Sequence, residues 1–227
     1  MKKFLILSAF VLVLPLSALA KQPNLPPGLA KHSHAPGTNV TSPDGTLWMI
    51  AANGTRRAYS SSGAFLSYGF NSYAYVVPAN AGDLALPVGA FISPCNGKLI
   101  ASDNGPDTGT VYLMTDGKKA AFTGAEVFTG LGFSFANVRT ASLTGVPFAD
   151  PITSPKQKHP KDVLINKHGT VLYMGSSGVY GIADMATFNS WGFSFSDVVN
   201  STKADDALPQ VGVLPPRQPG ELSPAIQ

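Results

Sequence analysis

The stretch GFSFANV, from Gly132 to Val138, returns as GFSFSDV from Gly192 to Val198, and a looser version, GFNSYAYV, begins at Gly69. Three copies of one apolar motif indicate a repeated structural unit, because an active site seldom needs the same motif three times. The copies lie in longer frames with shared markers, which are Gly45, Gly109 and Gly169 at the start, Phe65, Phe128 and Phe188 inside, and Pro87, Pro147 and Pro209 at the end. We therefore predict three tandem repeats of about sixty residues, at 37–89, 90–149 and 150–214.

The middle repeat shows the expected local structure most clearly. Its four strand-like runs are Ala90–Ser93, Lys98–Ser102, Thr110–Met114 and Lys118–Phe122. Asp116-Gly117 between two of them is a strong hairpin signal, because both turn positions need positive φ. A short helix is predicted within 124–131, ended by Gly132, and the aromatic residues Phe133 and Phe135 are expected to pack back on the sheet.

Four antiparallel strands and a short helix per repeat predict an all-β fold with propeller-like blades. The first repeat lacks a clear first strand, and Gln210–Leu214 is a spare strand at the other end of the chain. We expect this spare strand to complete the first blade and close a ring, which would remove exposed sheet edges. An open tandem array of the same units is the alternative.

Residues 1–20 have the pattern of a secretory signal peptide. Lys2 and Lys3 precede the apolar run Phe4–Leu16, and Ala18-Leu19-Ala20 supplies a cleavage site. The sequence thus predicts export, to the periplasm or to the extracellular space or cell surface, with no membrane span after cleavage. Residues 21–36 and 215–227 are rich in proline and are expected to be flexible or extended arms.

Charge and cysteine content narrow the class of protein. The signal peptide carries two of the 16 basic residues and none of the 13 acidic ones, so the mature chain has a net charge of about +1. Such a chain lacks the basic stripe of a nucleic-acid-binding protein. Cys95 is the only cysteine, so an intramolecular disulfide is excluded, and its position after a strand-like run predicts a buried thiol.

Catalytic and metal-binding patterns are weak. The four histidines lie outside any nucleophile-elbow or zinc-peptidase motif, so we expect no catalytic residue and no cofactor. His32 and His34 are a poor metal site without a third ligand, and a solvated arm is the favoured interpretation. Asp103–Asp107 offers oxygen ligands but lacks the spacing of a calcium loop, which favours an ordinary turn and no metal site.

Two basic pairs are the candidate ligand-binding residues. Arg56, Arg57, Lys118 and Lys119 occupy equivalent hairpins, where they could meet acidic glycans or a partner protein. Charge protecting a solvated edge strand explains them as well. The third repeat has Gly178-Val179-Tyr180 at this place and no basic pair. The recurring aromatic residues are expected to form the core between sheet and helix.

The repeat resembles one found in exported bacterial cell-envelope proteins. The shared pattern is GTVYL, three residues, GKK, two residues and F, followed by VF, three residues and GF-x-F-x-x-V, over Gly45 to about Leu214. The resemblance implies a location and a scaffold, since such repeats are generally of unknown biochemical role. The blade layout is also similar to that of hemopexin-type propellers, as an analogy of layout that carries no haem or metal site.

These observations predict a secreted, non-enzymatic β-repeat protein that serves as a binding or structural module at the bacterial cell envelope or outside the cell. Its expected partner is a cell-wall or extracellular glycan or an envelope protein, and oligomers are possible. Two alternatives stay open. One is an envelope glycan hydrolase with carboxylates on its loops, and the other is a self-assembling surface component.

Overall fold

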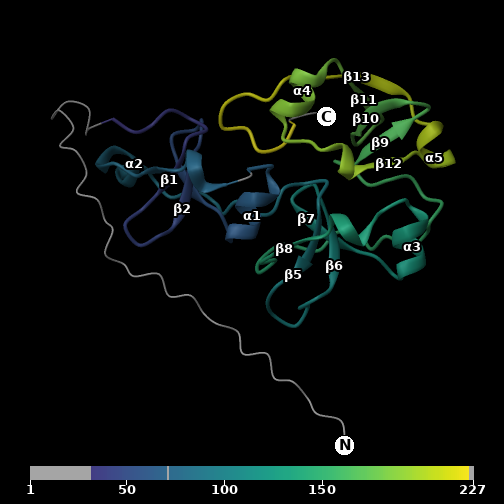
Figure 1. The fold of residues 1–227 in the computed structure, drawn as a ribbon, viewed down its shortest axis with the longest axis horizontal. Helices are drawn as coiled ribbons and strands as arrows, with labels where there is room; N and C mark the ends of the chain where they lie inside the picture. Colours follow the sequence, from purple (N-terminus) through teal and green to yellow (C-terminus); the bar gives the residue numbers. More distant parts are fainter. Residues whose placement is uncertain (1–31, 71, 225–227) are drawn as a thin grey trace, which may run out of the picture.

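A computed structural model describes residues 32–70 and 72–224 of the 227-residue chain. The predicted signal peptide and residues 21–31 of the predicted N-terminal arm lie outside the described residues. The described part is mostly β, with three small sheets and five short α-helices, which confirms the predicted class of a β protein with short helices. Figure 1 shows the three groups of strands around the middle of the molecule.

The three sheets share one strand order over four strands. The first sheet has the order β3-β2-β1-β4, the second β7-β6-β5-β8 and the third β12-β9-β10-β11-β13. In each, three consecutive antiparallel strands are followed by a strand that returns parallel to the first of them. The strands are β1 (Asn39–Thr41), β2 (Leu47–Ile50), β3 (Arg56–Ala58), β4 (Val77–Pro78), β5 (Leu99–Ser102), β6 (Val111–Thr115), β7 (Lys118–Ala121), β8 (Arg139–Ala141), β9 (Leu164–Lys167), β10 (Thr170–Met174), β11 (Val179–Ile182), β12 (Val198–Asn200) and β13 (Gln210–Leu214).

Turn chemistry sets the hairpins as predicted. Asp116 and Gly117 between β6 and β7 have φ of 51° and 72°, which is the backbone that their sequence favours. The three antiparallel strands predicted for the middle of the chain are confirmed as β5, β6 and β7, with ends within one residue of the prediction.

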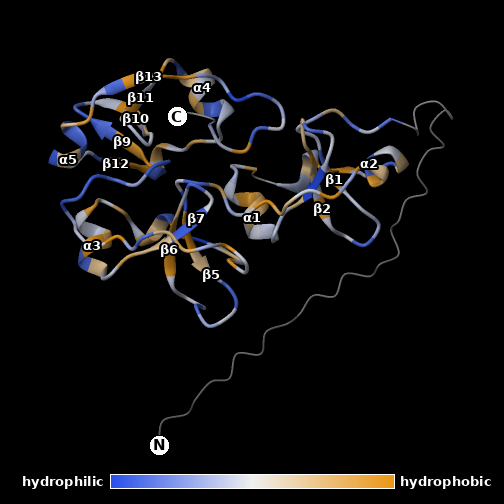
Figure 2. Ribbon diagram, turned by 180° about the vertical axis from the view of Figure 1, so that it is seen from behind, coloured by the Kyte–Doolittle hydropathy of each residue, from blue (hydrophilic) through white to orange (hydrophobic). Residues whose placement is uncertain are grey.

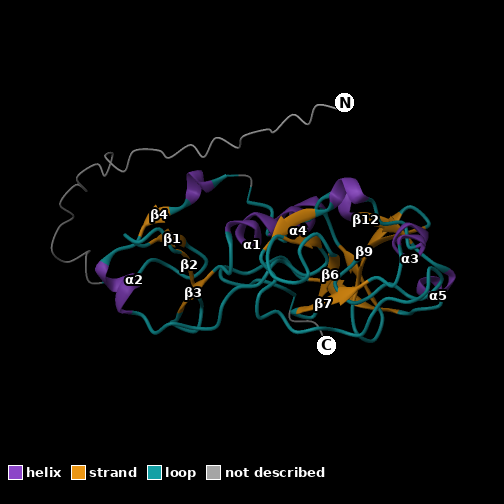
Figure 3. Ribbon diagram, turned by 90° about the horizontal axis from the view of Figure 1, so that it is seen from below, coloured by secondary structure: helices purple, strands orange, loops and turns teal. Residues whose placement is uncertain are grey.

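A short helix and a 3₁₀ turn lie between the third and fourth strands of each sheet. The α-helices are α1 (Ser62–Ser67), α2 (Ala81–Ala85), α3 (Ala125–Gly130), α4 (Met185–Ser190) and α5 (Lys203–Asp206), and the 3₁₀ turns are η2 (Tyr73–Tyr75), η3 (Phe135–Asn137) and η4 (Phe195–Asp197). The predicted helix within 124–131 is confirmed as α3, and Gly132 follows it with φ of 81°. Figure 3 shows α2 at one end of the molecule, α3 and α5 at the other, and α1 and α4 between them.

The segments predicted as first strands of each repeat instead extend the preceding sheet. Ile92 forms a parallel bridge with Tyr59 of the first sheet, and Ile152 forms the equivalent bridge with Phe122 of the second. Each segment pairs with the free edge of the sheet that precedes it in the chain, and this pairing covers an edge that would otherwise be exposed. The predicted first strand at Ala90–Ser93 is therefore wrong.

The predicted ring closure by the C-terminal strand is not found. β13 pairs in parallel with β11 of its own sheet and does not complete the first sheet, and no closed ring of strands is present among residues 32–70 and 72–224. Between β11 and β13 the chain passes through α4, η4, β12 and α5, and β12 occupies the opposite edge of the third sheet, so β13 covers the edge that is left beside β11.

The start of the predicted C-terminal arm is packed against the protein instead of extended. Trp191 donates its indole N–H to the Pro215 carbonyl at 2.7 Å, and the Arg217 backbone N–H donates to the Ser190 hydroxyl at 3.0 Å. Further along, Leu222 packs against the apolar cluster of the first sheet. The chain after β13 thus joins the third sheet to the first by side-chain packing.

Apolar residues of the strands and helices form the core. Figure 2 shows hydrophobic residues along strands such as β5 and β6, which contribute Leu99 and Leu113 to the largest buried cluster. Neighbouring units also touch closely. A Cβ added at Gly63 of α1 would lie 2.1 Å from the Thr140 carbonyl oxygen of β8, so the helix of the first unit packs directly on the second sheet.

Candidate functional site

Each 3₁₀ turn carries an aromatic ring that lies on a buried phenylalanine of the preceding helix. The stacked pairs are Tyr73 on Phe65, with centroids 5.2 Å apart and planes inclined by 13°, Phe135 on Phe128, at 4.3 Å and 26°, and Phe195 on Phe188, at 4.7 Å and 21°. The inner ring is buried in all three pairs. The three turns thus hold their rings in one common arrangement.

The outer rings are exposed to solvent. Tyr73, Phe135 and Phe195 are 48%, 57% and 59% exposed. A ring that is covered on one face by a stacked neighbour and is still half exposed presents its other face to solvent. The expectation that Phe135 packs into the core is therefore wrong, because the 3₁₀ turn directs its side chain away from the sheet.

A serine before each exposed ring fixes the turn. The hydroxyls of Ser72, Ser134 and Ser194 accept the backbone N–H of the residue two positions later, at 3.2–3.3 Å. This local hydrogen bond starts the 3₁₀ turn and turns the next side chain outward. The Ser-aromatic pair in all three copies of the opening phrase is the sequence signal for these exposed rings, and sequence reasoning that counted aromatics alone missed Tyr73 and Phe195 as surface residues.

Polar contacts hold the second and third turns in place. Asn137 of η3 donates its side-chain N–H to the Ser196 carbonyl of η4 at 2.5 Å. Asp197, the last residue of η4, forms an ion pair with Lys98 at 2.5 Å, and the two side chains are only 10% and 4% exposed. Because a buried ion pair of this kind is costly to break, η4 is firmly attached to the start of β5.

A groove beside the first turn adds hydroxyl groups to the exposed Tyr73 ring. Its volume is about 570 Å³, within the range of roughly 300–1,000 Å³ that is usual for small-molecule sites. The lining residues are Thr41, Gly45, Thr46, Leu47, Tyr59, Ser61, Ser62, Tyr73 and Val76. None of them carries an acidic or basic side chain, so the groove offers an aromatic face, hydroxyls and a small apolar floor.

The structure places the four predicted basic residues on the edge strands β3 and β7, where they contact the protein itself. Arg56 lies 4.5 Å over the Trp48 ring, and Arg57 donates to the carbonyls of Ala90 and Phe91 at 2.9 and 3.2 Å. Lys118 is exposed at the start of β7. Arg56, Arg57 and Lys119 each have separate partners, so the four residues do not form one shared cluster of side chains in these contacts.

Lys119 is buried, in contrast to the surface position expected for it. Its ammonium group lies 2.9 Å from the Asp107 carboxylate, 5.1 Å from the Tyr112 ring centre and 4.3 Å from that of Phe148. The hydrogen bond from Lys119 is the main cause that lowers the pKa of Asp107. Asp107 of the predicted turn at 103–107 therefore serves as the partner of a lysine.

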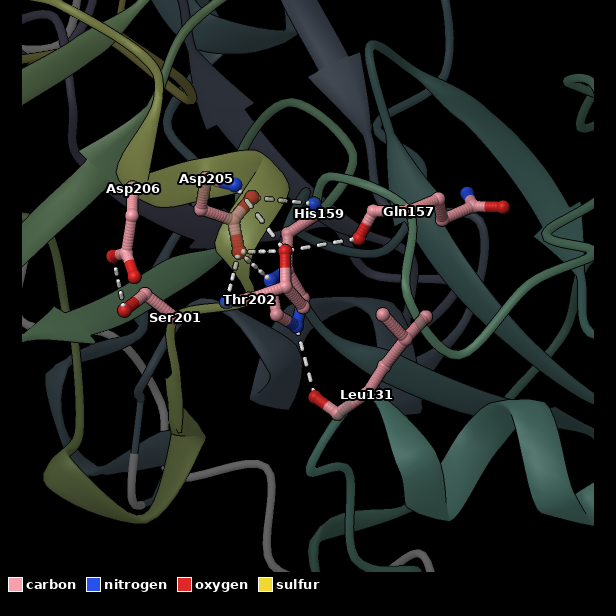
Figure 4. A network of polar contacts seen from close by, with 7 residues as sticks. All are labelled: Leu131, Gln157, His159, Ser201, Thr202, Asp205 and Asp206. Carbon is pink, nitrogen blue, oxygen red and sulfur yellow. Dashed lines mark hydrogen bonds and ion pairs between the residues drawn. The ribbon is translucent and has the colours of Figure 1, made fainter.

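A fully buried histidine–aspartate pair anchors the connector before β9, as Figure 4 shows. His159 donates its backbone N–H to one oxygen of Asp205 at 2.8 Å, and its Nδ1 lies 2.6 Å from the other oxygen. Its Nε2 lies 2.8 Å from the Leu131 carbonyl oxygen, which only accepts, so this nitrogen carries a proton. Both ring nitrogens are occupied and both side chains are inaccessible, so this pair contacts no solvent-borne substrate.

Asp205 owes its position to the start of α5. It occupies the third position of a capping box with Thr202, whose backbone N–H donates to the same carboxylate at 2.7 Å. Burial by itself raises the pKa of Asp205, but hydrogen bonds from the His159 side chain and from the Thr202 and His159 backbones outweigh it, and the pKa is lowered.

In the N-terminal segment, His34 forms the same two contacts with Asp83, at a partly exposed position. His34 donates its backbone N–H to Asp83 at 2.7 Å and places Nδ1 2.7 Å from the other carboxylate oxygen. Asp83 belongs to the capping box of α2 and is buried, whereas the His34 side chain is 35% exposed. His34, expected in a solvated arm, is thus held by the folded domain.

The Cys95 thiol is buried, as predicted. Its backbone N–H donates to the Ser67 hydroxyl at 2.7 Å, and the thiol donates to the Asn96 carbonyl at 3.4 Å. Burial raises the pKa of the thiol to about 11. A thiol of this kind is protonated near neutral pH and is a poor nucleophile.

Within residues 32–70 and 72–224, no group of three or more histidine, cysteine, aspartate and glutamate side chains is arranged to hold a metal ion. The same residues include no helix with the length and apolar character needed to cross a membrane. Comparison with models of known protein families and with curated protein sequences finds no match to the chain.

Proposed function

We propose that the protein is an exported, non-enzymatic module that binds glycans of the bacterial cell envelope or extracellular space. The observation that carries the proposal is the set of exposed rings of Tyr73, Phe135 and Phe195, each held flat on a buried phenylalanine. Exposed aromatic rings are costly to keep in water, and their recurrence at three equivalent turns favours a role in binding.

Aromatic faces suit sugars for a physical reason. The face of an aromatic ring carries partial negative charge, and the C–H bonds on one side of a pyranose ring carry partial positive charge. A ring that is already fixed by stacking loses little conformational entropy when a sugar lies on it. Three such rings on one chain would also raise the affinity for a long polysaccharide through multivalency.

The proposed scaffold has three tandem units of about sixty residues in a propeller-like arrangement. The support for it is the common strand order of the three sheets and the helix and 3₁₀ turn that follow the third strand in each. We favour an arrangement in which no strand pairing closes a ring and the C-terminal segment packs against the first unit. Export and the resemblance to cell-envelope repeats remain proposals, supported by the signal-like residues 1–20 and by the repeated pattern.

A co-sedimentation assay tests the proposal. The purified chain is mixed with insoluble peptidoglycan, chitin and cellulose, and the bound fraction is compared with that of the triple variant Tyr73→Ala, Phe135→Ala and Phe195→Ala. The matched control is Phe91→Ala with Phe148→Ala, which removes two rings that are 71% and 62% exposed but are not held on a helix phenylalanine. Binding that is lost only in the triple variant supports the proposal, and binding that is equal in all three proteins contradicts it.

The same assay also tests the basic pairs. Removing the exposed charge with Lys118→Ala tests the prediction that the basic hairpins meet acidic glycans. A loss of binding to acidic polymers in this variant, with the triple aromatic variant unaffected, would assign recognition to the hairpins instead of the rings.

Self-assembly is the second candidate function, and β13 favours it. This strand lies at the edge of the third sheet, and its side chains Val211 and Val213 are 44% and 55% exposed. An exposed apolar edge strand invites pairing with another chain. Sedimentation velocity would show a large species that the double variant Val211→Lys and Val213→Lys disperses. A monomer in both proteins would rule this candidate out. Among the described residues, no observation favours the hydrolase alternative.

A further inference from the structure

We propose that the groove beside Tyr73 is a binding site for a neutral pyranose sugar. This inference rests on the proposed glycan-binding function and assigns one site and one ligand class to it. The groove joins four parts of the first unit, because its lining residues come from the β1–β2 hairpin, the residue after β3, the start of α1 and the turn η2 with its C-cap.

The aromatic wall of the site is preorganised. The Tyr73 ring lies on Phe65, which is 1% exposed and is itself stacked on Phe70 with centroids 4.6 Å apart. The Ser72 hydroxyl fixes the turn that carries Tyr73. Because three stacked rings restrict the position of Tyr73, its open face is ready to receive the flat side of a sugar ring.

Hydroxyl groups also line the groove. Ser61 accepts backbone N–H bonds from Ala64 and Ser142 at 3.1 and 3.3 Å, so its hydroxyl hydrogen is left to donate elsewhere. Ser62 is exposed at the first position of α1, and Thr41 lies at the end of β1. Hydroxyls that both donate and accept are well suited to sugar hydroxyls, which do the same.

The charge around the groove selects a neutral ligand. The nine lining residues include no acidic or basic side chain. The nearest carboxylate in sequence, Asp44, is occupied by hydrogen bonds from the Ser42 hydroxyl at 2.5 Å and the Thr46 backbone N–H at 3.0 Å. An exposed carboxylate next to the lining residue Gly45 and no cation in the lining disfavour an acidic sugar.

The second and third turns differ from the first in the contacts of their last residue. The residues that correspond to Tyr75 of η2 are Asn137 of η3 and Asp197 of η4, and both are bound to neighbouring elements. The sugar-sized groove is lined by Tyr73 of the first turn, and we expect Phe135 and Phe195 to offer flat rings to more distant parts of a long chain.

The test is chemical-shift mapping by NMR with maltose, cellobiose and N,N′-diacetylchitobiose as neutral probes and galacturonic acid disaccharide as the acidic probe. We expect at least one neutral probe to bind with a Kd on the order of 1 mM and to shift the amides of Thr46, Ser62 and Tyr73. Tyr73→Ala is expected to weaken this binding about tenfold, and Tyr73→Phe to retain most of it.

Tyr75→Ala is the matched control. This residue belongs to the same turn and is 87% exposed, but it does not line the groove, so its removal should leave the affinity unchanged. Neutral probes that shift only residues around Phe135 and Phe195 would overturn the groove and leave the proposed function standing. A lack of binding to any probe, together with a negative co-sedimentation assay, would overturn both. Tighter binding of the acidic probe would overturn the assigned ligand class.

Discussion

His159 and Asp205 are joined by two contacts that use all the polar atoms of the carboxylate, a backbone N–H bond of 2.8 Å and an Nδ1–Oδ2 contact of 2.6 Å. His34 and Asp83 repeat both contacts at the first unit, at 2.7 Å each. In each case the aspartate also caps a short helix, so one carboxylate fixes a connector and a helix start together. Both pairs therefore have a structural role. We call the buried pair His159–Asp205 the inner clasp and the partly exposed pair His34–Asp83 the outer clasp.

Removing the inner clasp should destabilise the protein strongly. His159→Asn removes the imidazole contacts to the Asp205 carboxylate and to the Leu131 carbonyl in a dry site, and we expect a loss of about 3–5 kcal/mol in the free energy of unfolding. The matched variant His34→Asn acts at a half-exposed position and should cost about 1 kcal/mol. Urea unfolding measures both. Equal losses for the two variants would contradict the assigned difference in burial.

The inner clasp also gives the stability a pH dependence of known sign. The pKa of Asp205 is lowered in the folded protein, so the stability that its carboxylate contributes is present above the ordinary carboxyl pKa of about 3.9. That stability is lost as the pH falls through the lower pKa of the folded state. The destabilisation caused by Asp205→Asn should therefore be largest above pH 4 and shrink below it. A destabilisation of the same size at pH 7 and pH 2.5, measured by urea unfolding, would contradict this account.

Gly63→Ala tests the contact between the first helix and the second sheet. Alanine normally stabilises a helix by roughly 0.5–1 kcal/mol relative to glycine. At this position the new Cβ would lie 2.1 Å from the Thr140 carbonyl oxygen, so we expect the substitution to destabilise by about 1–3 kcal/mol instead. Ser62→Ala, at the neighbouring exposed position, should change the stability by less than about 0.5 kcal/mol. A stabilising Gly63→Ala, in thermal or urea unfolding, would show that α1 and β8 are not in close contact.

The Cys95 thiol should be unreactive in the folded protein. Its pKa of about 11 and its burial keep it protonated and covered at pH 8. A thiol reagent such as dithionitrobenzoate is expected to release about one equivalent only after unfolding in urea. Rapid release from the folded protein would contradict the buried position.

Local sequence signals predicted the hairpins and helices well. The Asp116-Gly117 turn and the helix before Gly132 depend on backbone preferences of a few neighbouring residues, and both are confirmed. The expected place of Gln210–Leu214 was wrong because the choice between two sheet edges depends on chain connection in space, which a strand-like pattern does not contain.

The sequence predicted the candidate site less well, because the direction of a side chain also depends on the backbone in space. Phe133 and Phe135 are two residues apart in one apolar phrase, yet the first is 7% exposed and the second 57%. The 3₁₀ turn η3 begins at Phe135 and separates its direction from that of Phe133, and the signal of this turn is the single hydroxyl of Ser134. Lys119 shows the opposite case, because a lysine with an acidic partner and two aromatic neighbours lies inside the protein.

The central claim is that fixed aromatic rings on the 3₁₀ turns bind sugars by their faces. Saturation-transfer-difference NMR with a soluble fragment of whichever glycan the protein retains in co-sedimentation measures this most directly. The account predicts that saturation reaches the C–H protons on one side of the sugar ring, is abolished in the triple variant of Tyr73, Phe135 and Phe195, and persists in the control variant of Phe91 and Phe148. Undiminished transfer in the triple variant would contradict it.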